Sequence, residues 1–148
     1  MNGYANQYLN NQIASASPEQ LLLMLYDGAI RFTKLAIQAI EANDIPKRAY
    51  YVNKASAIIS ELDATLDHNQ DASLAENLDA LYHYLLKQLM NGNKDNDAAP
   101  LEETVDMLRG LRETWAKAIE IARQEQAAGH SAAGEVTAAP QPKIAAAL

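Results

Sequence analysis

Three histidines are the residues of this chain best suited to chemistry, because imidazole titrates near neutral pH and binds metal ions. The 148-residue sequence has no cysteine, which excludes disulfides and thiolate metal sites. His68 falls in a polar connection, His83 within a helical pattern and His130 in an alanine-rich tail, and nothing predicts that they converge. A di-iron bundle would need two inward-facing Glu-x-x-His pairs, and the sequence contains none. We therefore expect no metal and no cofactor.

Two acidic segments, 67–72 and 93–98, alternate carboxylates and amides as a calcium-binding loop does. Both lack the glycine that such a loop needs at its sixth position. The twelfth position is Leu78 in one case and Thr104 in the other, where the loop requires glutamate. The sequence predicts solvated turns at these segments, not calcium sites.

His83 raises one further alternative, a histidine phosphotransfer domain. Such acidic helical domains carry an exposed histidine with a lysine three residues later, followed by glycine. Here Lys87 comes four residues later and Gln88 follows it, so an ordinary surface histidine is favoured. No set of nucleophile, base and orienting residue can be assembled from the sequence, and we expect a protein that is not an enzyme.

Composition narrows the partner classes. The formal net charge is -7 and the pI is near 4.8, which argues against a nucleic-acid-binding surface. The first twelve residues contain six Asn or Gln, and the first basic residue is Arg31, so a signal peptide is not expected. No apolar run approaches the ~18 residues of a membrane helix. We expect a cytoplasmic protein with no membrane insertion.

The elements that would position any site are helical. Apolar residues recur at helical spacing in four segments, about 18–42, 46–66, 73–90 and from 100 onward. Short polar connections between them predict an all-α, antiparallel four-helix bundle over residues 17–128. Residues 1–16 would form an N-terminal arm, and the Ala-, Gly-, Ser- and Pro-rich segment 129–148 a disordered tail. Gly110 either marks a close helix contact or costs about 1 kcal/mol.

The first of these helices has more apolar surface than a bundle needs. Ser17, Pro18 and Gln20 form a capping box with proline in the first turn, and Leu21 to Tyr26 are then all apolar. One stripe fits the bundle seam, and a second lies about 100° away. The surplus predicts that this helix also binds another chain. The expected seam is Leu22, Leu25, Ala29, Phe32, Ala36 and Ile40, and the second stripe is Leu23, Tyr26, Ile30 and Ile37.

Tyrosines support the same interpretation. Tyr51 and Tyr82 fit the seams of their helices, which leaves Tyr50 and Tyr84 for outer surfaces. They would either cap the rim of the core or line a groove for a partner helix. The candidate groove residues are Leu23, Tyr26, Ile30, Tyr50 and Tyr84.

The N-terminal arm is polar except for four apolar residues at four- and five-residue steps: Tyr4, Tyr8, Leu9 and Ile13. We expect these residues to act as a weak lid over the groove. Whether the arm docks on its own chain or on a neighbour is left open by the sequence. An uncovered groove would favour a weak homodimer.

The order and spacing of many residues between about 4 and 120 resemble the FliS-type flagellar secretion chaperones. The resemblance implies a bundle that binds the C-terminal segment of flagellin, prevents its premature polymerisation and delivers it to the export-gate component FlhA. It departs from the family at Asp71-Ala72, where members often have Gly-Gly. An unrelated helical adaptor for another amphipathic helix is the alternative. The matching residues are Tyr4, Ala14 to Leu21, Met24 to Ala29, Lys54, Ala55, Ile58, Ile59, Leu62, Leu66, Asp67, Ala75, Asn77, Leu78, Leu81, Tyr82, Tyr84, Asn93, Asp97, Glu102, Glu103, Leu108 and Trp115.

Overall fold

The computed structural model describes the backbone of residues 3–133 and the side chains of residues 6, 7 and 9–129. Five helices follow one another within this range, and no strand occurs in it. The all-α prediction is therefore confirmed. The helices are α1 (Gly3–Ser15), α2 (Pro18–Glu41), α3 (Ile45–Ala64), α4 (Ala72–Asp95) and α5 (Ala99–Ala133).

Side-chain caps set where the helices begin. The Ser17 hydroxyl accepts from the backbone N–H of Gln20, and the Gln20 side chain accepts from the backbone N–H of Ser17, which is the expected capping box. Asp44 caps α3. Asp71 caps α4 by accepting from the backbone N–H of Leu74, so the helix begins one residue before the segment 73–90 that the spacing predicts.

Helix α4 also ends later than the sequence suggests. We expected a loop from Asn91, because Asn, Asp and Gly are weak helix formers. The helix continues to Asp95 and stops at Asn96, whose φ of 51° is the left-handed conformation of a helix C-cap. Tertiary contacts explain the extra turn. Gly92 is buried under Leu101, and Arg48 Nε donates to Asn93 Oδ1 at 2.8 Å.

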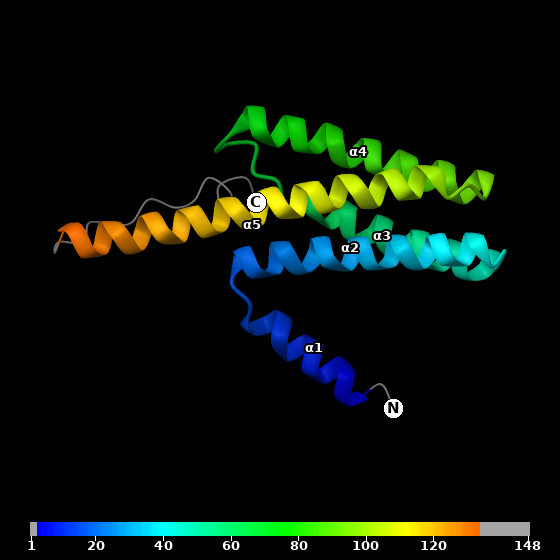
Figure 1. Cartoon of the computed structure of the whole chain (residues 1–148), viewed down its shortest axis with the longest axis horizontal. Helices are drawn as coiled ribbons and strands as arrows, with labels where there is room; N and C mark the ends of the chain where they lie inside the picture. The colour runs from blue at the N-terminus through cyan, green and yellow to red at the C-terminus, as the bar shows by residue number, and fades with distance from the viewer. Residues whose placement is uncertain (1–2, 134–148) are drawn as a thin grey trace.

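Helices α2 to α5 form an antiparallel ring in which α2 packs against α3 and α5, and α4 packs against the same two helices (Figure 1). Helix α5 extends well past the adjacent ends of α2 and α4, and its described length reaches Ala133, beyond the boundary at 128 that composition suggested. The remainder of the expected disordered tail, 134–148, lies outside the described residues.

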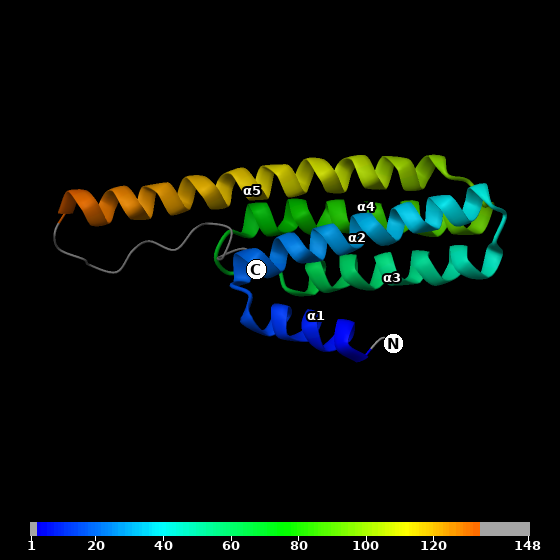
Figure 2. The same ribbon diagram turned by 60° about the horizontal axis from the view of Figure 1, so that its bottom comes forward.

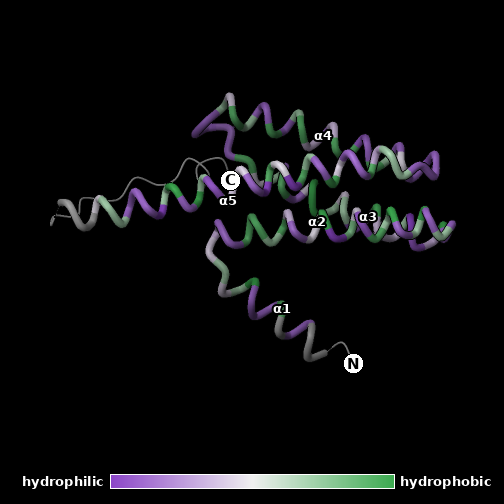
Figure 3. Tube along the Cα trace, viewed as in Figure 1, coloured by the Kyte–Doolittle hydropathy of each residue, from purple (hydrophilic) through white to green (hydrophobic). Residues whose placement is uncertain are grey.

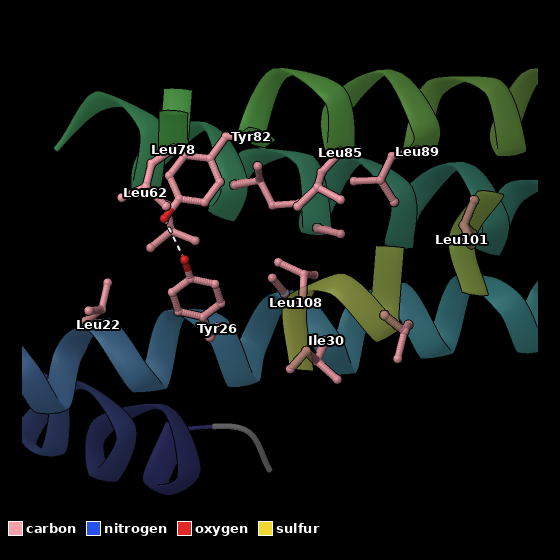
Figure 4. Packing of buried hydrophobic residues seen from close by; sticks show 14 of the residues in the cluster. Leu22, Tyr26, Ile30, Leu62, Leu78, Tyr82, Leu85, Leu89, Leu101 and Leu108 are labelled. Atoms are coloured by element: carbon pink, nitrogen blue, oxygen red, sulfur yellow. Dashed lines mark hydrogen bonds between the residues drawn. The ribbon is translucent and has the colours of Figure 1, made fainter. Parts of the chain in front are cut away.

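The core lies along the axis of this ring. Green and purple segments alternate along each bundle helix in Figure 3, as expected for helices that bury one stripe. Figure 4 shows leucines of α3, α4 and α5 directed toward Leu22, Tyr26 and Ile30 of α2. The remaining large buried side chains include Ile59, Leu62, Leu85, Leu89, Leu101 and Leu108.

Helix α1 stands outside the bundle, folded back from the start of α2 on the side where α3 lies (Figure 2). The chain turns between Ser15 and Pro18. The N-terminal segment is thus a helix connected to the bundle at one end.

Candidate partner-binding surface

The inner face of α2 carries a buried polar contact. The hydroxyls of Tyr26 and Tyr82 lie 2.6 Å apart (Figure 4), and Trp115 Nε1–H donates to the Tyr26 oxygen at 3.0 Å. Burial raises the pKa of Tyr26 and of Tyr82, because a phenolate in this position would lose its hydration. Hydrogen bonds therefore connect one residue of α2, one of α4 and one of α5 inside the core.

This contact corrects the interpretation of the second stripe on α2. Tyr26 is 0% exposed and Ile30 is also buried, so placing these two residues on an outer surface is wrong. The observed inner stripe keeps Leu22, Ala29 and Ala36 of the expected seam and takes Tyr26 and Ile30 from the second stripe, so it lies between the two. A helix that is apolar almost all round gives two stripes about 100° apart, and spacing alone does not say which one faces the bundle axis. The inner stripe is Leu22, Tyr26, Ala29, Ile30, Thr33 and Ala36.

This orientation leaves another apolar stripe on the opposite side of α2, next to α3. These side chains are half-buried, which means that each still presents part of its apolar surface to solvent. Leu25 and Phe32, which we expected in the seam, belong to it. Its members on α2 are Leu21, Met24, Leu25, Gly28, Phe32 and Leu35.

Helix α3 continues this surface. The rings of Phe32 and Tyr51 stack with centroids 6.2 Å apart, and Tyr50 packs edge-on against Tyr51. Ile58 lies against Gly28, where a Cβ would come within 3.1 Å of Ile58 Cδ1. We call this surface the α2–α3 face, made of the six α2 residues above with Tyr50, Tyr51 and Ile58.

Cations border the aromatic part of the α2–α3 face. The Arg31 guanidinium lies 4.6 Å from the centroid of Phe32, and Lys54 Nζ lies 5.4 Å from that of Tyr50. Tyr50 itself is 54% exposed, so its outer placement is confirmed. Neighbouring side chains therefore hold the rings of Phe32 and Tyr50 in place, while part of Tyr50 remains accessible to solvent.

Tyr84 is also exposed, at 42%, but it lies elsewhere. Its hydroxyl donates to Glu103 Oε1 at 2.5 Å, and Gln88 donates to the other oxygen of the same carboxylate at 2.9 Å. This hydrogen bond raises the pKa of the Tyr84 hydroxyl. Tyr84 thus faces α5 from α4, whereas Tyr50 borders α2 from α3, and a single straight helix would not cover both.

The other candidate residue, Leu23, is half-buried and packs against the core. Near it, Asp27 accepts two hydrogen bonds from Arg112 of α5, at 2.6 and 3.1 Å. This side of α2 is therefore closed by α5.

The lid residues divide in two groups. The side chains of Tyr4 and Tyr8 lie outside the described residues. Leu9 and Ile13 are 48% and 45% exposed, so about half of each side chain is open to solvent. Docking of the arm stays a prediction.

His83 does not meet the other histidines but lies beside two aspartates. Its Nδ1 is 3.2 Å from Asp79 Oδ1 and 4.0 Å from Asp63 Oδ2, and it donates to the Asp79 carbonyl at 2.8 Å. These interactions raise the pKa of His83. Burial, with the neighbouring Asp79, raises the pKa of Asp63. Sequence reasoning missed this cluster, because only the antiparallel packing of α3 on α4 brings Asp63 to His83.

No helix within residues 3–133 has an eighteen-residue stretch apolar enough to cross a bilayer.

The sequence matches a known protein family over most of its length. The model of the family described as flagellar protein FliS matches residues 1–122.

Several relatives carry the name flagellar secretion chaperone FliS. The protein of Bacillus subtilis is 35% identical over 80% of this chain and 88% of its own length. That of Campylobacter jejuni is 36% identical over 74% of this chain and 86% of its own. That of Salmonella typhimurium is 35% identical over 76% and 84%.

Proposed function

Since this chain belongs to the FliS family of flagellar secretion chaperones, we propose that it binds the C-terminal segment of flagellin through the α2–α3 face. The observation that carries the proposal is the half-buried apolar stripe of α2 beside the exposed ring of Tyr50 and the half-buried Tyr51 and Ile58 of α3. Leu25, Phe32 and Ile58 pack against the edge of the core, and each keeps part of its apolar surface open to solvent. Apolar surface of this kind, gathered on one side of a bundle, is typical of a binding site for another chain.

The dimensions of the face fit a helical partner. From Leu21 to Leu35 it spans fourteen residue steps of α2, which is roughly 21 Å or four helical turns at 1.5 Å per residue. A segment that is disordered before binding must offset its ordering entropy with a long apolar contact. At the centre of the stripe Gly28 has no side chain, and Ile58 of α3 supplies the apolar surface there.

Tyr84 gives the proposal a second part. Its position near α5 would be reached only by a partner that continues around the bundle after leaving the α2–α3 face. We assign Tyr50 to the main contact and Tyr84 to a contact of such an extension, whereas Leu23 packs against the core on the side closed by α5 and is not assigned to the partner. Tyr26 and Ile30 would support the binding helix from the core without touching flagellin.

Binding of this kind accounts for a chaperone role without catalysis. A flagellin segment held on the α2–α3 face would be unavailable for polymerisation in the cytoplasm. The loaded chaperone would then deliver flagellin to the export gate through FlhA. Neither the unrelated adaptor nor the phosphotransfer domain is kept as a proposal, because the family assignment covers most of the chain.

Calorimetry with a peptide of the flagellin C-terminal segment tests the binding site. Replacing a central aromatic contact by alanine typically costs about 2 kcal/mol or more. We therefore expect Tyr50→Ala to weaken binding by roughly thirtyfold, at 1.4 kcal/mol per tenfold. The matched control is Met90→Ala, which removes an exposed apolar side chain of α4 away from this face.

Folded Tyr50→Ala protein that binds the peptide as well as the Met90→Ala control would contradict the assignment of the face. Tyr84→Ala separates the two parts of the proposal. A loss with a long peptide but not with a truncated one would support the wrapping partner. Association with the cytoplasmic part of FlhA, measured with and without flagellin peptide, tests delivery; its absence in both states would exclude that role.

The N-terminal helix completes the proposal as a lid. Helix α1 folds back on the side of α3, and Leu9 and Ile13 are its exposed apolar residues. A thirteen-residue helix is marginally stable alone, but its connection to α2 gives it an effective concentration on the order of millimolar. Weak docking would then cover the face and still yield to flagellin.

Stopped-flow association tests the lid. A lid reduces the apparent affinity by the fraction of open molecules. We expect deletion of residues 2–15 to raise the peptide on-rate and to promote self-association. A slower on-rate or a faster off-rate after deletion would show instead that the arm itself holds flagellin.

A further inference from the structure

A second group of side chains is independent of the α2–α3 face. Asp63, in the last turn of α3, meets Asp79 and His83, which lie one turn apart on α4. One ligand atom of each residue lies within 4.8 Å of the others. Two carboxylates and an imidazole therefore converge from two helices.

One oxygen of this cluster lacks a partner. Asp63 Oδ1 is buried and accepts no hydrogen bond, although its side chain as a whole is 21% exposed. Asp63 and Asp79 also repel each other when both are ionised. A divalent cation between them would relieve this repulsion more fully than His83 does and would lie beside a carboxylate that has one unpartnered oxygen.

We propose that Asp63, Asp79 and His83 form a binding site for one Zn²⁺ ion, which connects the end of α3 to α4. Tetrahedral zinc with N and O ligands at about 2.0–2.2 Å holds those atoms about 3.3–3.6 Å apart. The present separations of 3.2 and 4.0 Å from His83 Nδ1 are close to that spacing. Small rotations of Asp79 and His83, whose side chains are 41% and 62% exposed, bring the ligands into place.

The donor set determines the class of ion. Calcium takes six to eight oxygen ligands, and magnesium keeps several waters around one or two carboxylates. A mixed imidazole and carboxylate set with three protein ligands suits zinc, with water in the fourth position. Binding at Nδ1 replaces the hydrogen bond from His83 Nδ1–H to the Asp79 carbonyl, and the bound neutral imidazole carries its proton at Nε2.

The fold itself does not depend on this site. The core of α2 to α5 is closed by apolar side chains and by the Tyr26, Tyr82 and Trp115 contact. Zinc would therefore add stability to a bundle that is already folded. The apparent melting temperature should rise with zinc concentration, as for any ligand that binds only the native state.

Titration calorimetry of the untagged full chain, freed of metal with a chelator, tests the site with ZnCl₂ as the probe. We expect one binding event per chain. Loss of a supporting residue around a metal typically costs ten- to a hundredfold in affinity, and loss of a ligand should cost at least as much. Asp63→Asn, Asp79→Asn and His83→Gln should thus each weaken zinc binding by at least tenfold, with unchanged helicity by circular dichroism.

His68→Ala is the comparison variant, because it removes the other imidazole whose charge acts on Asp63 and leaves the three proposed ligands in place. It should keep the wild-type affinity within twofold. A loss equal to that of His83→Gln would support the site and identify His68 as its fourth ligand. Wild-type protein without a zinc heat, or the three ligand variants binding zinc as the wild type does, would overturn the proposal. Zinc should also raise the melting temperature of the wild type but not of His83→Gln.

Discussion

Tyr26 and Gly28 lie two residues apart on α2 and have opposite surroundings. Tyr26 is 0% exposed and shares hydrogen bonds with α4 and α5. Gly28 is half-buried on the α2–α3 face, against Ile58 alone among side chains of the described residues. Two residue steps rotate a helix by about 200°, so one helix serves the core on one side and the candidate partner on the other.

The apolar residues of α2 are alike in composition, but those on the inner side contribute to folding and those on the outer side are available for partner binding. The inner stripe has its partners within the chain, so changes there should alter folding. The outer stripe has apolar surface open to solvent, so changes there should alter partner binding and should affect stability less than changes in the inner stripe. Measuring stability and binding on the same variants therefore tests the division directly.

The largest effect is expected for Tyr26→Ala. Truncating a buried aromatic residue typically costs about 3–5 kcal/mol, and here it also leaves Trp115 Nε1–H without its acceptor. Tyr50→Ala, on the outer side, should change stability by less than about 1 kcal/mol. Urea unfolding measures both. If Tyr26→Ala is too unstable to purify, Tyr26→Phe gives the smaller effect of the hydroxyl alone.

The next largest effect on stability is expected for the hydroxyl pair of Tyr26 and Tyr82, and it depends on pH. Tyr82→Phe removes one buried hydrogen bond and should cost about 1 kcal/mol at neutral pH. The folded pKa of Tyr82 is raised above its unfolded value, so the unfolded chain loses this proton first. The contribution is therefore fully present below about pH 10 and is lost as pH rises above it.

Unfolding measured in steps from pH 8 to above pH 10 should show a steeper loss of stability in the wild type than in Tyr82→Phe. Parallel curves would mean that Tyr82 reaches solvent and that the inner contact opens in the native state.

Substitution of two glycines that differ in their surroundings should change stability by a smaller amount. Gly110 lies within α5, and a Cβ there would meet no atom within 4 Å, so the alternative of a close helix contact is wrong. Gly110→Ala should stabilise the protein by about 1 kcal/mol through helix propensity. Gly28→Ala should gain less, because its Cβ would press on Ile58 Cδ1. Equal increases in the unfolding temperature of the two variants would show that Ile58 moves away from the added methyl group without cost.

The smallest effect is expected for the ion pair of Asp27, the residue between Tyr26 and Gly28. Both Asp27 and Arg112 are partly exposed, and exposed pairs contribute about 0.2–1 kcal/mol. A double-mutant cycle with Asp27→Asn and Arg112→Met should give a coupling in this range that falls with added salt. A coupling of several kcal/mol would show that α5 shields this side of α2 more than the exposure indicates.

Local chemistry explains what could be predicted from the sequence. Ser17, Pro18 and Gln20 mark the start of α2, because a capping box depends only on residues within one turn. The spacing of apolar residues indicated the four helices and the all-α class for the same reason. The resemblance to FliS, which rested on residues spread over the chain, agrees with the family match over residues 1–122.

Contacts between helices decided the rest. Whether Tyr26 or Phe32 faces the core depends on how α2 is rotated against α3 and α5, and an almost uniformly apolar helix carries no local signal for that rotation. The last turn of α4 forms because Arg48 and Leu101 pack on it, against the weak helix propensity of its own residues. Asp63 and His83 are twenty positions apart along the chain, and only the antiparallel packing of α3 on α4 places them together. Local spacing thus determined which segments are helical, and the packing of one helix on another determined which face of each is free to bind.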